Sequence, residues 1–340
     1  MDALVLRVAI FVLALALPAW IALSLLVVLG RARYDRRQEA HVGELRPREV
    51  ARLIQRARGR PRTDWGRWRR VAALTRLARA HHLAAPRLLR RALADSDPRI
   101  ATAAIRSLGD LGDGWAIDML VSALRDGSAP RSRTAAQLER LAPVPGPRFV
   151  PLLRYPHPAV RFWAATLLGP YPELGREGLI ALTWDTDPNV RAAAVETLGS
   201  RSGNAVGAAM LARLDDPAWF VRVHAARAAG HVVGADAAPS ITPLLADRQW
   251  WVRTAAKDAL RGMGSDAVPA LLAVLGHPDA FARNGAAEVL QDVGFVDTLA
   301  FEQPSSPLLE RIYEAGGERL REAAQSRAER QSARRTERAA

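Results

Sequence analysis

The chain has 340 residues, a formal net charge of +13 and no cysteine. The lack of cysteine excludes a disulfide framework, a thiol nucleophile and a cysteine-type zinc site. Residues 31–90 hold 18 arginines and five acidic residues, a balance of +13, whereas residues 91–340 hold 29 basic and 29 acidic residues. The whole excess of positive charge therefore lies near the N-terminus, and the rest of the chain is neutral on average.

Residues 1–30 are predicted to form a transmembrane anchor. Residues 8–29 contain 22 amino acids without a charged side chain. At about 1.5 Å per residue, a helix of this length spans a hydrocarbon core of ~30 Å. A cleaved signal peptide is the alternative, but the run is long, its N-terminal flank is weakly charged, and no small-residue cleavage site follows it. We therefore expect an uncleaved, single-pass anchor in the inner (plasma) membrane.

Four arginines follow the apolar run directly: Arg31, Arg33, Arg36 and Arg37. Positive charge beside a membrane span favours a cytoplasmic location for that side, so we expect the N-terminus outside and the rest of the chain in the cytoplasm. The same arginines are predicted to contact anionic lipid headgroups. Residues 31–64 are predicted to be a basic juxtamembrane linker, with a helix near residues 47–58 where apolar residues recur at helical spacing.

A cassette with a constant period of about thirty residues dominates the rest of the chain. Its strongest copies begin at Asp187, Asp216 and Asp247, and weaker ones begin at residues 97, 157 and 277. Arginines at one cassette position are separated by 30, 31, 31 and 30 residues: Arg161, Arg191, Arg222, Arg253 and Arg283. Such a period is typical of a solenoid, in which each unit buries its apolar face by stacking on the next.

The cassette itself predicts a helix. An Asp-Pro pair suits a helix start, because Asp caps free amides and Pro at the first position needs no hydrogen-bond partner. Alanines then allow a neighbouring helix to approach closely, and a Leu-Gly pair such as 108–109, 168–169 or 198–199 is expected to end the helix in a left-handed turn. A second apolar helix lies between successive cassettes, so each period predicts one helical hairpin.

This pattern resembles the short HEAT-like repeat of bacterial proteins, a repeat also found in phycobilisome-lyase-type proteins. The resemblance covers residues 65–294. It implies an all-α, right-handed solenoid of about seven to eight helical-hairpin repeats, each stabilised by stacking on its neighbours. Residues 143–147 hold three prolines and are expected to break the array locally. Residues 295–324 are predicted to be a C-terminal capping helix, and residues 325–340 a charged tail without apolar periodicity.

The repeated charged residues have two interpretations, an anion-binding surface or a structural ladder of hydrogen bonds. An acid lies six residues before several of the arginines, and HEAT-like repeats commonly use such residues for contacts within and between repeats. We therefore favour the structural ladder. Its predicted members are Arg161, Asp187, Arg191, Asp216, Arg222, Asp247, Arg253 and Arg283.

Large aromatic residues also recur at equivalent positions. Trp219 and Trp250 share one repeat position, and Phe220, Trp251 and Phe281 share the next. Equivalent positions in a solenoid form a stripe on one surface, and Trp and Phe are well suited to contact a partner. The simpler alternative, which the sequence by itself favours, is that these residues fasten the start of one helix onto the adjacent repeat. Trp219 and Trp250 are the best candidates for partial exposure.

No pattern of catalytic residues is recognisable. The sequence has no His-Glu pair, which disfavours a HEAT-repeat iron hydroxylase, and no phosphate-binding glycine loop, nucleophile elbow or zinc-spaced cluster. We therefore expect no cofactor, metal or small-molecule substrate, and we predict a non-enzymatic scaffold for a membrane or membrane-proximal protein, such as an envelope-assembly enzyme. A lyase- or hydroxylase-like enzyme is the alternative. Nucleic-acid binding is less favoured, because the repeat array carries no excess of positive charge.

Overall fold

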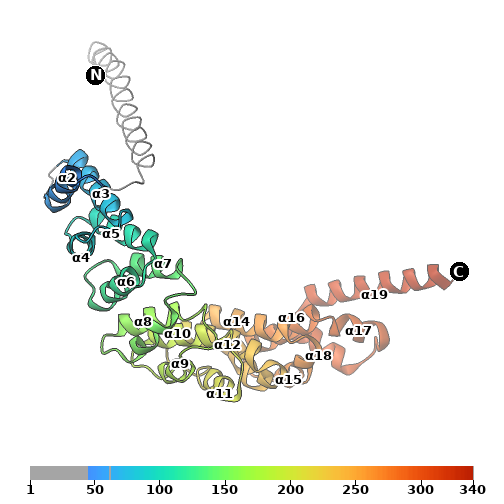
Figure 1. Ribbon diagram of the computed structural model, residues 1–340. Helices are drawn as coiled ribbons and strands as arrows, with labels where there is room; N and C mark the ends of the chain where they lie inside the picture. Colours follow the sequence, from blue (N-terminus) through green and yellow to red (C-terminus); the bar gives the residue numbers. More distant parts are fainter. Residues whose placement is uncertain (1–44, 61–62, 340) are drawn as a thin grey trace, which may run out of the picture. The chain divides into compact units, whose positions relative to one another are not determined.

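The computed structural model describes residues 45–60 and 63–339, which form α-helices joined by turns and short 3₁₀ helices (Figure 1). The predicted transmembrane anchor and the predicted lipid-contacting residues Arg31, Arg33, Arg36 and Arg37 lie outside the described residues. Among the helices of the described part, none is both long enough and apolar enough to cross a bilayer.

The chain divides into two compact units, residues 1–137 and 138–340. The described part of the first unit consists of successive helical pairs. These are α2 (Pro47–Arg58) with α3 (Asp64–Arg79), α4 (Ala85–Leu93) with α5 (Pro98–Leu111), and α6 (Gly114–Asp126) with α7, which runs from Arg131 to Glu139 across the boundary. Helix α3 packs against both α2 and α5, and α5 packs against α4 and α6. Stacked hairpins of this kind confirm the predicted all-helical repeat architecture.

Helix α2 belongs to the stack rather than to a linker. Its residues Leu53 and Ala57 are almost fully buried. The Ala57 carbonyl accepts a hydrogen bond from Arg70 Nε of α3 at 3.0 Å, and Glu49 pairs with Arg76 at 2.6 Å. The helix predicted near residues 47–58 is therefore confirmed, and because α2 supplies one side of the first hairpin, the stack begins before residue 65. Residues 31–44 of the predicted linker lie outside the described residues.

The second unit repeats the same arrangement in two layers (Figure 1). Helices α8 (Pro158–Leu167), α10 (Pro188–Leu198), α12 (Trp219–Val232), α14 (Trp250–Gly262) and α16 (Ala280–Asp292) form one layer. The other layer contains η1 (Gly146–Arg148), η2 (Val150–Arg154), α9 (Arg176–Leu182), α11 (Asn204–Ala212), η3 (Gly234–Ala237), α13 (Ala238–Ile241), η4 (Thr242–Ala246), η5 (Gly264–Ala267) and α15 (Val268–Val274). The proline-rich segment 143–147 forms a turn that leads into η1, in agreement with the predicted local break.

The Asp-Pro helix start is confirmed only for part of the cassettes. Asp97, His157 and Asp187 each accept a hydrogen bond from the backbone amide two residues later, and a proline occupies the first helical position. Asp216 and Asp247 also accept the amide two residues later, but that amide precedes the helix, because α12 and α14 begin three residues after the aspartates, at Trp219 and Trp250. Alignment on the arginines shows the reason: Asp187 lies four residues before its arginine, whereas Asp216 and Asp247 lie six before theirs.

The glycines of the Leu-Gly pairs do not adopt the predicted left-handed turn. Gly199 has φ −61°, and neither Gly109 nor Gly169 is among the residues with positive φ. Gly199 instead permits close packing, because a Cβ atom added there would lie 3.2 Å from the Ala228 Cβ of α12. Gly230 makes the equivalent approach to Ala259 of α14, at 3.0 Å. The small residues of the cassette therefore set the distance between stacked helices rather than end them.

The C-terminal part also differs from the prediction. It contains α17 (Phe295–Glu302), α18 (Pro307–Gly316) and α19 (Glu318–Ala339) in place of one capping helix at 295–324. Helix α18 packs against α16 and buries Leu309 and Ile312, so the stack continues beyond residue 294. Residues 325–339 of the predicted charged tail are helical. Their Ala, Arg, Glu and Gln residues favour a helix intrinsically, which a search for apolar periodicity does not detect.

Candidate functional site

The predicted ladder forms a repeated arginine–aspartate contact in the second unit. In each case the arginine Nε and Nη2 atoms donate to both oxygens of one aspartate in the following repeat. The pairs are Arg161–Asp185 (2.6 and 2.8 Å), Arg191–Asp216 (2.8 and 2.8 Å) and Arg222–Asp247 (2.8 and 2.9 Å). Such two-point, charge-assisted bonds fix both distance and orientation.

Each pair also fastens backbone segments. Arg191 Nη1 donates to the carbonyl oxygen of Asp185 at 2.8 Å, and Arg222 Nη1 donates to that of Asp216 at 2.8 Å. The Asp216 carboxylate accepts the amide of Ala218 at 3.0 Å. These groups are therefore occupied inside the fold, which supports a structural role over an anion-binding surface for the paired arginines. Asp187 has a different role from the one predicted, because it caps α10 and forms no arginine pair within the described part of the chain.

The environment of Asp216 keeps it ionised. Burial is the strongest single influence and by itself raises the pKa of the carboxyl group. The hydrogen bonds from Arg191 and from the Ala218 amide act in the opposite direction, and the resulting pKa lies below the ordinary value. The pKa of Asp185 is lowered in the same way, by Arg161 and by the Asp187 amide against the effect of burial.

The ladder is incomplete after Asp247. Arg253 Nη1 donates to the Asp247 carbonyl at 2.8 Å, as in the preceding repeats, but no carboxylate of the described residues contacts its Nε or Nη2. His277 occupies the aspartate position, and the Arg253 guanidinium lies 4.6 Å from the centre of the Phe281 ring. Arg283 likewise contacts only backbone carbonyls in the described chain, those of His277 (2.7 Å) and Pro278 (2.8 Å).

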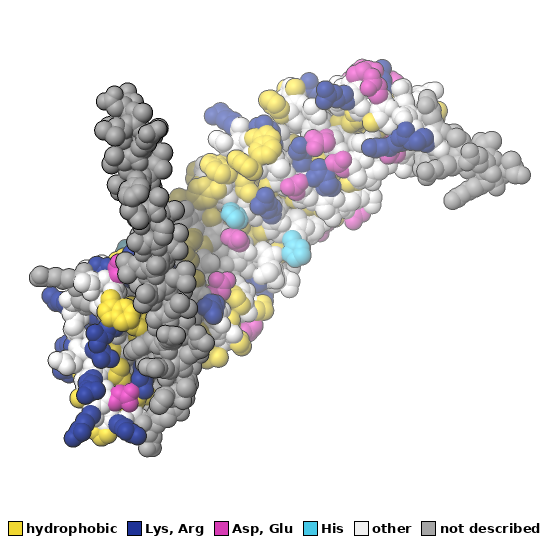
Figure 2. Space-filling model, turned by 90° about the horizontal axis from the view of Figure 1, so that it is seen from above, with side chains coloured by type: hydrophobic (Ala, Val, Ile, Leu, Met, Phe, Trp, Pro, Cys, Tyr) yellow, Lys and Arg dark blue, Asp and Glu magenta, His cyan; other side chains and the backbone are white. Residues whose placement is uncertain are grey.

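The five predicted partner-binding residues lie in the first turns of three helices that stack in order, α12, α14 and α16. We call this set the aromatic edge: Trp219, Phe220, Trp250, Trp251 and Phe281. Four of its residues are exposed, by 40% for Trp219, 55% for Trp250, 56% for Trp251 and 64% for Phe281, and Phe220 is half-buried. Packing against the adjacent repeat therefore leaves much of the surface of these four residues accessible to solvent. Figure 2 shows hydrophobic side chains gathered on one face of the second unit, between charged ones.

Trp184 is a further exposed aromatic residue that periodicity did not reveal. Its side chain is 63% exposed, and the Arg213 guanidinium lies 3.7 Å from the centre of its ring. Arg213 also approaches Asp216 at 3.3 Å, so it joins this ring to the ladder. The equivalent positions of the next two repeats hold Asp215 and Ala246, and therefore no repeated aromatic pattern marked Trp184.

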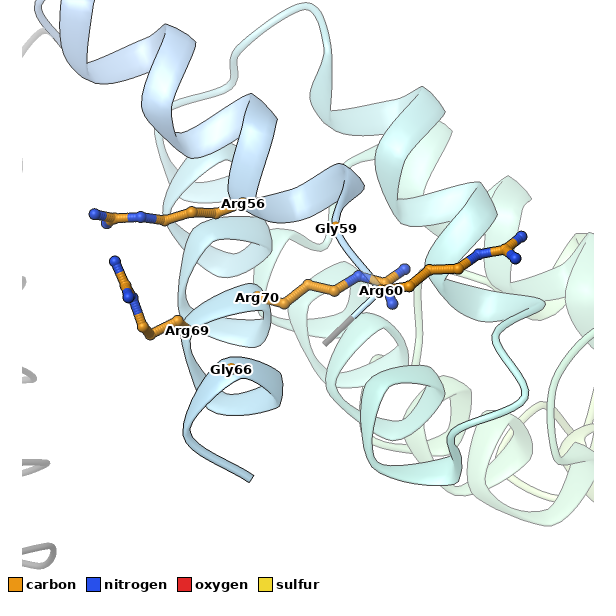
Figure 3. Close-up of a pocket in the computed structure, with 6 residues that line it drawn as sticks. All are labelled: Arg56, Gly59, Arg60, Gly66, Arg69 and Arg70. Atoms are coloured by element: carbon orange, nitrogen blue, oxygen red, sulfur yellow. The ribbon is translucent and has the colours of Figure 1, made fainter. Parts of the chain in front are cut away.

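A basic pocket lies between α2 and α3 in the first unit. It has a volume of about 340 Å³ and is lined by Arg56, Gly59, Arg60, Gly66, Arg69 and Arg70. Figure 3 shows the Arg56 and Arg69 side chains extending to the same side, whereas Arg60 and Arg70 extend to the other. Arg70 is buried and pairs with Asp95 at 2.7 Å, as the ladder arginines pair in the second unit.

The other arginines of the basic pocket have no acidic partner among the described residues. Glu49 and Asp64, the nearby acids of α2 and α3, already pair with Arg76 and Arg67. Arg56, Arg60 and Arg69 consequently concentrate positive charge at the part of the chain where the sequence places its excess. Within residues 45–60 and 63–339, no group of three His, Asp or Glu side chains could hold a metal ion.

The stacked helical hairpins define the protein as an α-solenoid. The chain belongs to the family described as HEAT repeats, whose model matches residues 50–139, 146–230, 176–261 and 207–291. No curated protein matches the sequence. The resemblance to HEAT-like repeats is therefore confirmed at the level of the family.

Solved structures with a similar fold have low sequence identity. A chain in the structure of Kap95p with RanGDP is 13% identical, with a TM-score of 0.52, and the match covers 84% of this chain and 48% of that chain. An engineered protein is 17% identical, with a TM-score of 0.43 and coverage of 78% and 87%. Human deoxyhypusine hydroxylase in complex with glycerol is 20% identical, with a TM-score of 0.32 and coverage of 73% and 96%. At these identities the similarity concerns the fold alone.

Proposed function

We propose that this protein is a non-enzymatic scaffold whose HEAT-repeat solenoid binds a partner protein through the aromatic edge. The observation that carries the proposal is the exposure of Trp219, Trp250, Trp251 and Phe281 at equivalent positions of successive repeats. Large exposed aromatic side chains lose water-contacting apolar area when a partner covers them, and such residues dominate binding energy at protein interfaces. The structure in which Kap95p binds RanGDP offers a precedent for protein binding by a related fold.

The proposal includes a membrane tether. The uncharged run at residues 8–29 and the arginines behind it support an anchor in the inner membrane with the solenoid in the cytoplasm. A tether raises the effective concentration of the solenoid near other membrane proteins. The partner is accordingly a membrane or membrane-proximal protein, for example an envelope-assembly enzyme. Arg31, Arg33, Arg36 and Arg37 would contact anionic headgroups, and the basic pocket adds Arg56 and Arg69 to the same charged region.

A crosslinked pull-down from native membranes tests the binding surface. The full-length protein is compared with a Trp219→Ala/Trp250→Ala double variant and with Trp184→Ala, which removes an exposed tryptophan outside the aromatic edge. Circular dichroism establishes that the variants are folded. A partner lost from the double variant and retained by Trp184→Ala supports the proposal, whereas equal recovery by all three proteins rejects the aromatic edge as the binding surface.

The tether is tested separately. Membranes are washed at alkaline pH, which releases peripheral proteins and leaves membrane-spanning ones in the pellet, and reporter fusions at each end give the orientation. Retention in the pellet with a cytoplasmic C-terminal reporter is the expected result. Release into the wash would reject the anchor without affecting the proposed binding surface.

A further inference from the structure

Where the ladder ends, the Nε and Nη2 atoms of Arg253 form no contact with a carboxylate of the described residues. Its Nη1 atom donates to the carbonyl oxygens of Asp247 (2.8 Å) and Arg248 (3.3 Å). Arg222 makes the same two contacts one repeat earlier, with Asp216 (2.8 Å) and Pro217 (3.4 Å). The guanidinium of Arg253 is thus held by the same kind of backbone contacts, and its Nε and Nη2 atoms are the pair that holds an aspartate in the three preceding repeats.

His277 replaces only half of the missing aspartate. Its Nδ1 accepts a hydrogen bond from the amide of Asp279 at 3.1 Å, just as Asp247 accepts one from the amide of Gln249 at 2.8 Å. A neutral imidazole that accepts at Nδ1 carries its proton on Nε2, so the remaining nitrogen is a donor. The position therefore offers no oxygen to Arg253. Where the earlier repeats have a carboxylate acceptor, this repeat has only the N–H donors of Arg253 and His277.

The acids around this position are already used. Asp247 pairs with Arg222, and the Asp279 side chain accepts the amide of Ala282 at 2.9 Å. The Phe281 ring covers a face of the Arg253 guanidinium, whereas a carboxylate binds in the guanidinium plane, so the two contacts are compatible. Trp250 and Trp251 lie on the same first turn as Arg253 and are more than half exposed.

We propose that Arg253 binds a carboxylate of the partner protein, which takes the place of the aspartate that the ladder lacks. The partner segment combines an Asp or Glu side chain with neighbouring apolar residues, because Phe281 lies against the Arg253 guanidinium and the exposed Trp250 and Trp251 lie on the same helical turn as Arg253. This inference deepens the proposed function, since it rests on the aromatic edge as the binding surface and specifies the chemistry of what binds there.

The first test introduces the missing aspartate of the ladder into the protein itself. In the full-length protein, His277→Asp supplies the carboxylate that the preceding repeats have at this position. The expected result is a higher Tm for His277→Asp than for the wild type, and no such increase when Arg253→Gln is also present. An unchanged or lower Tm for His277→Asp, or an equal increase in the Arg253→Gln background, would show that the Nε and Nη2 atoms of Arg253 are not available for a carboxylate.

The second test measures binding to the site. Random peptides displayed on phage are selected on the full-length protein in detergent, and the enriched peptides are resynthesised with each Asp or Glu changed to Asn or Gln. We expect enriched peptides with an acidic residue beside apolar ones. Their affinity should fall about tenfold or more with Arg253→Gln or with the neutral peptide, without further loss when both changes are combined. His277→Asp should weaken the same peptides, because its own carboxylate pairs with Arg253.

Arg248→Gln is the matched control, since it removes an exposed arginine from the start of the same repeat while its backbone carbonyl stays in place. Peptides equally sensitive to Arg248→Gln and Arg253→Gln, or enriched without an acidic residue, would overturn the inference. Peptides that depend on Trp250 but not on Arg253 would leave the aromatic edge intact and reject only the carboxylate. If native partners bind equally well after Trp219 and Trp250 are changed to alanine, the proposed function is wrong.

Discussion

The substitution Asp216→Ala isolates the energetic contribution of the ladder. The Asp216 side chain is 0% exposed and that of Arg191 is 11% exposed. Removal of the carboxylate leaves the Arg191 Nε and Nη2 atoms, and the Ala218 amide, without their acceptor. A buried guanidinium that loses its partner costs about 3–5 kcal/mol. We therefore expect the free energy of unfolding to fall by about that amount, a large part of the stability of a typical domain.

Urea unfolding followed by far-ultraviolet circular dichroism measures the loss. Because repeat arrays can unfold in parts, hydrogen exchange of the α10 and α12 amides is measured as well, and protection should fall most in these two helices. Asp292→Ala is the control: it removes a partner of Arg261 from a surface pair whose side chains are 39% and 37% exposed. Such an exposed pair contributes only about 0–1 kcal/mol.

A double replacement distinguishes the net contribution of the ion pair from the cost of leaving one buried charge without a partner. Arg191→Met with Asp216→Leu removes both charges and leaves apolar side chains of similar size, so it should cost less than Asp216→Ala alone. Two results would refute this reasoning: a loss for Asp216→Ala no greater than that for Asp292→Ala, or a double replacement as damaging as the sum of both single ones.

Three further predictions concern pH, packing and lipid contact. The pKa of Asp216 is lower in the folded protein than its ordinary value of 3.8, so the stabilisation from its pairing is present above pH 3.8 and is lost as the pH falls through the folded-state pKa. An Asp216→Asn variant lacks this contribution, and acid titration followed by circular dichroism should therefore show that acid destabilises it less than the wild type. Gly146→Ala places a methyl group 2.4 Å from atoms of a buried tyrosine ring and should cost about 1–3 kcal/mol in urea unfolding, whereas Gly262→Ala, with nothing within 4 Å, should not destabilise. Arg56→Gln and Arg69→Gln should each weaken binding of short-chain phosphatidylglycerol to the full-length protein by about fivefold in a calorimetric titration, while an exposed arginine of α4 changed to Gln should have less effect.

Local patterns predicted much of the fold. The constant spacing of Arg161, Arg191 and Arg222 indicated stacked units, and apolar spacing indicated the helix at residues 47–58 before its role was known. These features depend on residues close together along the chain. Periodicity also identified the aromatic edge, because Trp219 and Trp250 occupy equivalent positions.

Other features could not be predicted in this way. The role of Asp216 depends on Arg191, which is 25 residues away in sequence and adjacent only when two repeats stack. In the sequence, Asp216 precedes a proline, and an aspartate in this position can either cap a helix or form an ion pair. Similarly, α2 was assigned to a linker because its basic charge was visible, whereas its burial against α3 was not.

The sequence alone therefore determined the repeat period, the helical hairpins and the segment that carries the excess charge, since each follows from residue type and short-range spacing. Only the tertiary structure decided which aspartate pairs with which arginine, which aromatic side chains remain exposed and where the ladder stops. Those properties arise when one repeat packs on the next, because pairing and burial depend on atoms that meet across the interface between repeats.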